Sequence, residues 1–331
     1  MRSVWKREDS IDLEPSKGDK WISMGMKESE RVKFELTWRH SNLRIINMVK
    51  NREDSLLQFR LQQGQRIQYK KLRILGSGSF GKVYKGEFND GSLVAVKLVK
   101  PRGGNTVWIQ REISTLAKLS HPHVINYFGY QIQGEIFEIF MGLKQGSLFS
   151  LLSTTKPLTL ADDYGFISGF LKEMLQTIHY LTTQGIIHRD IKPENILYMV
   201  NPRGERLFQL GDFGLCNNDP SDINSFVGTR AYMAPEVGRE PQTNKVDVWS
   251  LFMTLVWILD IEKFRIKARN GTNFIDCWSI VVRATETDLK DYREMAEISV
   301  SNRASAAQML IKLYGGEGLN SPEPEIRRFE G

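Results

Sequence analysis

The sequence has little cysteine and no long apolar run. Its two cysteines, Cys216 and Cys277, cannot build a disulfide framework in 331 residues, so a reducing compartment is expected. A membrane-spanning helix needs roughly 18 to 20 apolar residues. The longest candidate, 246–261, is interrupted by Asp247 and Asp260, which predicts a buried helix. We therefore expect no membrane insertion.

The sequence also lacks a large excess of charge of one sign. Its 45 Lys and Arg residues stand against 39 Asp and Glu residues, for a formal net charge of +6. Residues 1–66 carry +4 of this, but acids and bases alternate there, as on a solvated surface. The sequence has no basic block of the kind that indicates nucleic-acid binding. Residues 1–9 carry charges where a signal peptide would have an apolar core, so we expect an intracellular protein, cytoplasmic, nuclear or both.

The chain divides by pattern into three parts. Residues 1–67 form an N-terminal extension, polar and without a clear period over its first half. Residues 32–38 alternate apolar and polar side chains, which predicts a half-buried strand. The extension is either the remnant of a regulatory module or padding on the next domain. Residues 68–314 form the main domain, and 315–331 form a C-terminal tail.

Two acids and one amide stand at a spacing suited to phosphate chemistry. Residues 187–195 read Ile-His-Arg-Asp-Ile-Lys-Pro-Glu-Asn, and Asp212 opens an Asp-Phe-Gly sequence further on. Asp190 would accept or orient the proton of an attacking hydroxyl. Asn195 and Asp212 would bind Mg²⁺ through hard oxygen atoms. Lys192 would neutralise charge on the transferring phosphate.

These two motifs, in this order, resemble the catalytic loop and the metal-binding loop of the eukaryotic protein kinases, whose usual signature they match. The resemblance implies an α+β, bilobal fold, with a small β-rich N-lobe at about 68–141 and a larger helical C-lobe at about 144–314. It also implies a serine/threonine protein kinase that uses ATP and Mg²⁺ and acts on a protein substrate. Lys192 together with Thr229 favours the serine/threonine class. The oligomeric state stays open.

A glycine-rich stretch precedes Val83. It reads Gly76-Ser77-Gly78-Ser79-Phe80-Gly81. Glycines let backbone amides approach phosphates because no Cβ blocks them. Dinucleotide-binding folds carry the same pattern, but a helix follows it there. Here 83–88 and 93–97 are strand-like around an Asn-Asp-Gly turn, which favours a β-hairpin and resembles the kinase glycine-rich loop.

Lys97 ends the second of these strands. On its own it could be an edge residue whose ammonium reaches solvent. Residues 108–119 have the pattern of a helix, and Glu112 lies on it fifteen residues after Lys97. In the kinases this lysine pairs with that helix's glutamate, which directs the ammonium at the α- and β-phosphates. The alternative is a plain solvent-facing glutamate.

The resemblance also implies a nucleotide pocket. Phe140 would lie at its back, and Met141 to Leu143 would form the hinge whose backbone binds adenine; the alternative is an edge strand of the small sheet. The residues expected at the nucleotide are Leu75, Gly76, Ser77, Gly78, Ser79, Phe80, Gly81, Val83, Ala95, Lys97, Phe140, Met141, Leu143, Glu194, Asn195, Leu197 and Asp212.

Residues 217–227 are polar and glycine-free, as in a mobile activation loop. They lead into 228–236, which resembles the substrate-docking and loop-anchor segment of the kinases. Three residues are the regulatory candidates: Arg189, Ser225 and Thr229. A phosphate on Ser225 would dock on the Arg189 guanidinium and order both loops. Ser221 is the second choice, and the alternative is a plain solvated serine.

The resemblance is weaker near the C-terminus. By resemblance Asp247 steadies the catalytic loop, and Arg303 pairs with Glu236. Residues 262–296 lack the apolar Pro-Phe pattern usual in the family. This irregular segment is the one feature that suggests a pseudokinase scaffold. A small-molecule kinase of related fold is a further alternative, although those usually lack the motifs at 228–236.

Overall fold

The computed structural model describes residues 20–24, 32–39, 42–45, 66–78, 81–101, 103–201, 203–216, 228–271 and 274–319. The chain separates into two compact units, Met1–Leu56 and Leu57–Gly331. In the first unit, three antiparallel strands form a sheet in the order β1-β2-β3, with Trp38 opposite Leu43. These strands are β1 (Lys20–Met24), β2 (Val32–Arg39) and β3 (Asn42–Ile45). The strand predicted at 32–38 is confirmed, whereas the domain boundary at 67/68 stays a prediction.

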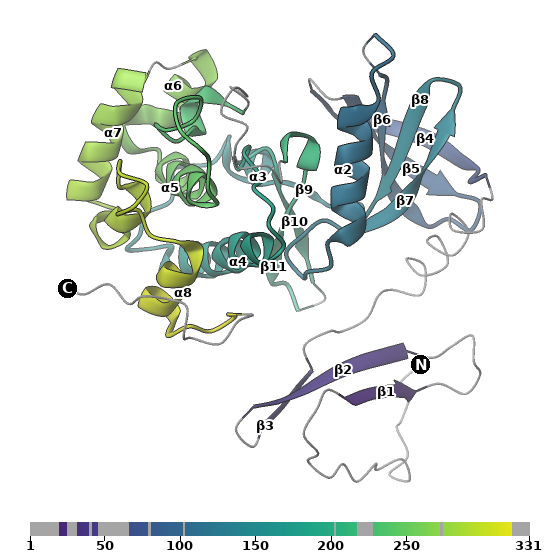
Figure 1. Cartoon of the computed structure of the whole chain (residues 1–331), viewed down its shortest axis with the longest axis horizontal. Coiled ribbons are helices and arrows are strands. Elements are labelled where there is room, and N and C mark those ends of the chain that lie inside the picture. The colour runs from purple at the N-terminus through teal and green to yellow at the C-terminus, as the bar shows by residue number, and fades with distance from the viewer. Residues whose placement is uncertain are drawn as a thin grey trace. The chain divides into compact units, whose positions relative to one another are not determined.

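The second unit begins with a five-stranded antiparallel sheet in the order β4-β5-β6-β8-β7, visible in Figure 1. Its strands are β4 (Tyr69–Gly78), β5 (Gly81–Phe88), β6 (Leu93–Val99), β7 (Tyr127–Gln133) and β8 (Ile136–Met141). The β5–β6 turn closes through a bond from the Gly91 amide to the Phe88 carbonyl at 2.9 Å. Gly91 takes φ +83°, which suits a residue without Cβ. A strand, not a helix, therefore follows the glycine-rich stretch.

Helix α2 (Val107–Lys118) packs against this sheet (Figure 1). Its apolar residues Ile109, Ile113 and Leu116 recur at helical spacing and are buried. Glu112 is buried on the same helix. The chain after α2 then ties the sheet to the rest of the unit, because the Ile125 amide donates to the Leu210 carbonyl at 2.9 Å.

The remainder of the unit is mainly helical. Its α-helices are α3 (Leu148–Leu152), α4 (Tyr164–Thr183), α5 (Lys245–Leu259), α6 (Phe264–Asn270), α7 (Phe274–Glu286) and α8 (Ala306–Tyr314). A small antiparallel sheet contains β9 (Gly146–Ser147), β10 (Ile196–Val200) and β11 (Arg206–Leu210). The short 3₁₀ helices are η2 (Phe213–Leu215), η3 (Arg230–Tyr232), η4 (Ile261–Lys263) and η5 (Lys290–Ala296). This arrangement confirms the α+β fold with a β-rich lobe and a larger helical lobe.

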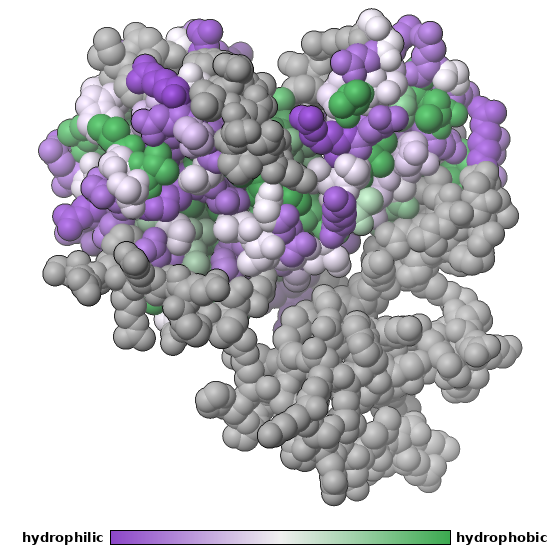
Figure 2. Space-filling model, in the orientation of Figure 1, coloured by the Kyte–Doolittle hydropathy of each residue, from purple (hydrophilic) through white to green (hydrophobic). Residues whose placement is uncertain are grey.

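Helix α5 is the centre of the helical lobe. It is apolar on all sides and buried along nearly its whole length, as a helix inside a core must be. Its polar side chains have partners: the Ser250 hydroxyl donates to the Tyr232 carbonyl at 2.8 Å, and Thr254 donates to the Ser250 carbonyl at 2.9 Å. Within the described part of the chain, no helix is long and apolar enough to cross a membrane. On the face shown in Figure 2, hydrophilic residues cover much of the described surface, with apolar residues scattered among them.

One buried ion pair joins distant parts of the helical lobe. The Arg303 guanidinium donates to both carboxylate oxygens of Glu236, at 2.6 and 2.9 Å, and its side chain is fully buried. It also lies 5.0 Å from the ring centroid of Trp249 on α5. A further bond runs to the Glu297 carbonyl at 2.8 Å. The pairing implied by resemblance is confirmed, and it anchors the segment that follows the activation loop.

Replacing Glu236 by glutamine should lower the free energy of unfolding by about 3–5 kcal/mol, because the Arg303 charge would stay buried without its counter-ion. Urea denaturation followed by circular dichroism measures this loss. The matched control is Glu240→Gln, since Glu240 is exposed only four residues away. Equal denaturation midpoints for the two variants would show that the pair does not stabilise the lobe.

Candidate active site

The Lys97 ammonium is the meeting point of three elements. It lies 2.6 Å from Glu112 Oε1 on α2 and 2.8 Å from Asp212 Oδ1, which precedes η2. Lys97 is 6 % and Glu112 1 % exposed, so neither the edge-lysine nor the solvent-facing-glutamate alternative holds. Burial would lower the pKa of Lys97, but the two carboxylates outweigh it and raise that pKa. The lysine is therefore charged at neutral pH.

Asp212 is held in a strained conformation. Its φ of 57° and ψ of 73° lie in the left-handed region, which costs a non-glycine residue about 1–3 kcal/mol. The next residue, Phe213, is buried with its ring edge-on to His188 at 4.9 Å, which fixes the turn. Burial by itself would raise the pKa of Asp212, but the Lys97 ammonium lowers it. The carboxylate is thus ionised beside the lysine.

The Asp190 carboxylate is surrounded by donors. Its Oδ2 accepts from Lys192 Nζ at 2.6 Å and from Asn195 Nδ2 at 2.9 Å. Its Oδ1 accepts from the Thr229 hydroxyl at 2.9 Å and the Thr229 amide at 3.1 Å. Lys192 also donates to the Thr229 hydroxyl at 2.7 Å. The structure therefore brings together four predicted site residues around one carboxylate.

The side chain of Asp247, on α5, holds the backbone of the catalytic loop. Its carboxylate accepts from the His188 amide at 2.8 Å and the Arg189 amide at 2.9 Å. Arg189 has a φ of 69°, again left-handed for a residue with a Cβ. Two charge-assisted bonds stabilise this unfavourable conformation. Asp247 thereby positions the neighbouring Asp190.

The residues expected to hold Mg²⁺ fit that ion. Asp212 offers a carboxylate, and the Asn195 amide nitrogen already bonds Asp190, which leaves the Asn195 carbonyl oxygen for a cation. Both are hard oxygen ligands. Among the described residues, no three His, Cys, Asp or Glu side chains gather to hold a metal. Proteins usually bind Mg²⁺ with one or two carboxylates plus phosphates and water.

The glycine-rich hairpin needs glycine at the residue where β5 begins. Gly81 has φ +135°, and a Cβ there would lie 2.3 Å from the Leu98 carbonyl oxygen. At Gly76 and Gly78 an added Cβ would meet nothing within 4 Å, so the fold itself does not demand glycine there. Open backbone on this hairpin leaves room for a ligand. Ser79 and Phe80 lie outside the described residues.

Comparison with known proteins agrees with this geometry. Residues 69–314 match the family described as protein kinase domain. The chain belongs to the protein kinase family. It is 34% identical over 205 residues to a mitogen-activated protein kinase kinase kinase 3 of Arabidopsis thaliana, covering 57% of this chain and 32% of that protein.

Two other relatives extend the comparison. A calcium/calmodulin-dependent protein kinase of Emericella nidulans is 32% identical over 281 residues, 79% of this chain and 66% of that protein. A serine/threonine-protein kinase of Dictyostelium discoideum is 38% identical over 189 residues, 55% of this chain and 25% of that protein. The chain thus spans between 25% and 66% of the length of these relatives.

One residue that the sequence predicts for the kinase nucleotide pocket, Phe140, lies on the other face of its strand. Phe140 lies opposite Val96, and its ring packs edge-on against Tyr69 at 5.6 Å, in the small core on the far side of the sheet from the catalytic lysine. Met141 lies opposite Ala95, and both belong to the main core on the lysine's side. Neighbouring residues of a strand point to opposite faces, so a register error of one reverses the side. The structure therefore places Phe140 on the face opposite Lys97 and Met141 on the Lys97 face, where Met141 stays a predicted nucleotide residue.

The other predicted nucleotide residues have the following places. Val83 lies opposite Lys97 across the β5–β6 pair. Leu143 and Leu197 pack partly buried against the main core, and Leu197 sits 3.2 Å from where a Cβ of Gly211 would be. Leu75, on β4, and Glu194 are exposed. Their roles at the nucleotide stay predictions.

His188 is a site residue that the sequence reasoning missed. It is fully buried, and its Nε2 lies 3.0 Å from the Gly211 carbonyl oxygen. With its ring edge at Phe213, it connects the catalytic loop to the metal-binding loop. The available signal was its position directly before the Arg-Asp pair, where a buried ring can bond the neighbouring chain.

Replacing Lys97 by methionine should reduce kcat/KM for ATP roughly 100-fold, because the charge directed at the phosphates disappears. Glu112→Gln should cause a smaller loss, since the lysine keeps its second partner, Asp212. The double variant should be no worse than Lys97→Met alone, because the two residues act through one bond. Steady-state kinetics on all three variants test this.

The matched control is Lys100→Met. Lys100 follows the same strand and pairs 3.1 Å from Glu135, but both side chains are largely exposed. Such a pair contributes little, so this variant should keep wild-type kinetics. Fully additive losses for Lys97 and Glu112 would contradict the pairing.

Proposed function

We propose that this chain is a serine/threonine protein kinase that transfers the γ-phosphate of Mg-ATP to a hydroxyl of a protein substrate. The observation that carries the proposal is the Asp190–Lys192–Thr229 arrangement. It presents a carboxylate, an ammonium and a fixed hydroxyl within hydrogen-bond distance of one another. The names of the relatives support the same class of reaction.

Asp190 acts on the substrate hydroxyl. Ionised carboxylates only accept hydrogen bonds, so Asp190 orients the hydroxyl and takes its proton as the oxygen attacks phosphorus. Lys192, 2.6 Å away, neutralises charge on the transferring phosphate. The Thr229 hydroxyl donates to the other carboxylate oxygen of Asp190. Most of the rate comes from this positioning, because phosphoryl transfer needs little covalent help from the protein.

Lys97, Asn195 and Asp212 prepare the nucleotide side. Asn195 and Asp212 would hold Mg²⁺, which when bound neutralises charge on the phosphates. Lys97 has a fixed carboxylate, Glu112, on one side and Asp212 on the other. With nucleotide bound, Glu112 would keep the Lys97 ammonium in place for donation to the phosphates.

The two alternatives are less well supported. A pseudokinase scaffold was suggested by the irregular segment 262–296, but that segment contains α6, α7 and η5. The Lys97–Glu112 and Thr229–Asp190 bonds support the active enzyme instead. A small-molecule kinase is disfavoured because Thr229 contacts Asp190 and Glu236 is anchored by Arg303. Absence of nucleic-acid binding stays a prediction.

Regulation through Ser225 is part of the proposal, although Ser225 and Ser221 lie outside the described residues. Support comes from Gly228, where the loop ends. Its φ is +115°, and a Cβ there would lie 2.6 Å from the Arg189 carbonyl oxygen, so the loop end rests on the backbone of the catalytic loop. An anion bound by Arg189 would bias both segments together.

Phosphorylation of Ser225 should raise kcat, and Ser225→Ala should stay at the basal rate. Arg189→Ala should abolish the difference between the two forms, because the docking cation is lost. Intact-mass spectrometry and rate measurement on the same samples provide the comparison, with Ser221→Ala as the control serine. Equal activity with and without phosphate at Ser225 would contradict this regulatory role.

Replacing Asp190 by asparagine should lower kcat roughly 10²–10⁴-fold, because the amide keeps the shape but cannot take the proton. Radiolabelled ATP and a generic protein substrate measure the rate, and thermal denaturation checks that the fold is retained. Asp90→Asn, in the exposed β5–β6 turn, is the control and should behave as wild type. Labelled phosphotyrosine, in place of phosphoserine and phosphothreonine, would argue against the proposed class, and full turnover by the asparagine variant would argue against Asp190.

A further inference from the structure

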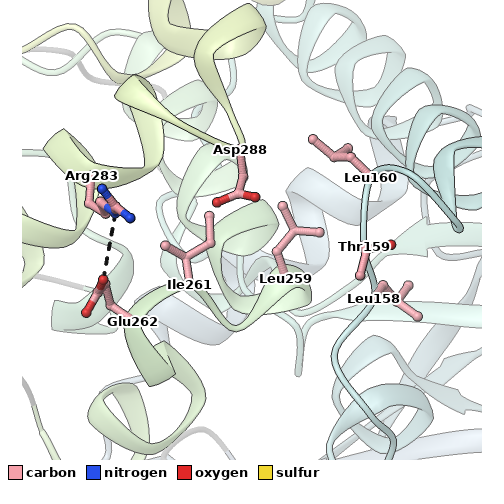
Figure 3. Close-up of a pocket in the computed structure, with 8 residues that line it drawn as sticks. All are labelled: Leu158, Thr159, Leu160, Leu259, Ile261, Glu262, Arg283 and Asp288. Atoms are coloured by element: carbon pink, nitrogen blue, oxygen red, sulfur yellow. Dashed lines mark ion pairs between the residues drawn. The ribbon is translucent and has the colours of Figure 1, made fainter.

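The helical lobe contains a cavity of about 240 Å³ away from the catalytic side chains. It lies between the chain before α4, the end of α5 and helix α7 (Figure 3). Part of its wall comes from 262–296, the segment in which the kinase resemblance is weakest. Its lining residues are Leu158, Thr159, Leu160, Leu259, Ile261, Glu262, Arg283 and Asp288.

Aliphatic and charged side chains both line the cavity. Figure 3 shows Leu259 and Ile261 between the Glu262–Arg283 ion pair on one side and the stretch from Leu158 to Leu160 on the other. The ion pair is long, at 4.0 Å, and both of its side chains are more than half exposed. Such an exposed ion pair contributes little free energy, so either side chain can pair with a ligand instead.

Asp288 is the second acid that lines the cavity. Its carboxylate is exposed and accepts a bond from the Thr287 hydroxyl at 3.1 Å. Within the described part of the chain, no cation lies at ion-pair distance from it. In Figure 3 the carboxylate stands beside Leu259 and Ile261. Among the lining residues, a ligand therefore meets two carboxylates and one guanidinium, which already pairs with Glu262.

The backbone at the cavity is strained. Asp260, Glu262 and Lys263 have φ of 51°, 52° and 58°, although none is glycine. Left-handed residues of this kind concentrate at functional sites, where the surrounding structure forces them. This observation is independent of the shape of the cavity, and one of the three residues, Glu262, lines it.

Arg265 maintains the strained turn. Its amide donates to Asp260 Oδ1 at 2.9 Å, and its guanidinium donates to the carbonyls of Leu152 at 2.8 Å and Ile258 at 2.8 Å. It also lies 4.7 Å from the ring centroid of Trp257. The turn is therefore pre-organised, so a ligand need not order it on binding.

We propose that this cavity docks a segment of a partner protein in which an aliphatic side chain stands next to arginine or lysine. The aliphatic side chain enters between Leu160 and Ile261, where burial removes apolar surface from water. The neighbouring cation pairs with Asp288 and Glu262. Anionic ligands are disfavoured because two carboxylates repel them, and a purely apolar ligand would leave the acids unused. The proposal does not depend on phosphoryl transfer, because docking requires no nucleotide.

Fluorescence anisotropy of a labelled peptide tests the proposal with the full chain and no ATP. The probe is a synthetic peptide with leucine-arginine-arginine-leucine between glycine-serine ends. Saturable binding is expected, weakened at least about tenfold when both leucines become serine or both arginines become glutamate. Asp288→Lys should weaken binding of the probe by about tenfold as well, because its attraction turns into repulsion.

Glu286→Lys is the matched control, since Glu286 is an exposed acid on α7 that does not line the cavity. It should leave binding unchanged, as should Asp190→Asn, so loss of catalysis and loss of docking are distinguishable. Leu160→Ser, with its fold checked by thermal denaturation, tests the aliphatic contact separately and should weaken binding.

Absence of saturable binding, or equal binding by wild type and Asp288→Lys, would overturn the proposal. An equal loss in Glu286→Lys would also overturn it, because binding would then reflect general charge attraction. The chain's own residues 326–329 read Ile-Arg-Arg-Phe, the same chemistry. If removing residues 320–331 strengthens probe binding about tenfold or more, the occupant is this tail and the assignment to a partner protein is wrong.

Discussion

The site depends on one buried cation between two carboxylates. Lys97 comes from the sheet, Glu112 from α2, and Asp212 from the helical lobe, so a single ammonium joins three elements that are far apart in the sequence. Burying the Lys97 and Glu112 charges is unfavourable unless they satisfy one another, and the half-buried Asp212 adds a second partner for the lysine. The arrangement therefore links the position of α2 to the position of the metal-binding loop. Any change that moves α2 away also removes a partner from the lysine.

Other buried carboxylates also have fixed hydrogen-bond donors, and they hold the catalytic loop. Asp247 uses both carboxylate oxygens on backbone amides, and Asp190 accepts from three side chains. These bonds compensate the left-handed conformation of Arg189. Each of the two carboxylates has fixed donors, and pre-organisation of this kind reduces the reorganisation that transfer would otherwise require.

Sequence reasoning succeeded where chemistry and spacing reinforce each other. The Asn-Asp-Gly turn identified the hairpin, and the apolar period of α2 brought Glu112 to the sheet. It did not foresee the face on which Phe140 lies, because an error of one residue reverses the face of a strand. Residues 262–296 also resisted prediction. Their helices are interrupted by the strained turn around Glu262, which Arg265 stabilises through contacts distant in sequence.

The central claim is that Lys97, Asn195 and Asp212 form one unit that holds a nucleotide together with its metal. Titration calorimetry of ATP into the wild type and into Asp212→Asn, each with Mg²⁺ and with EDTA, tests it most directly. We predict that Mg²⁺ strengthens ATP binding to the wild type roughly tenfold, about 1.4 kcal/mol, and has no such effect on the variant. Equal strengthening of both proteins by Mg²⁺, or equal affinity of the wild type with and without it, would contradict the account.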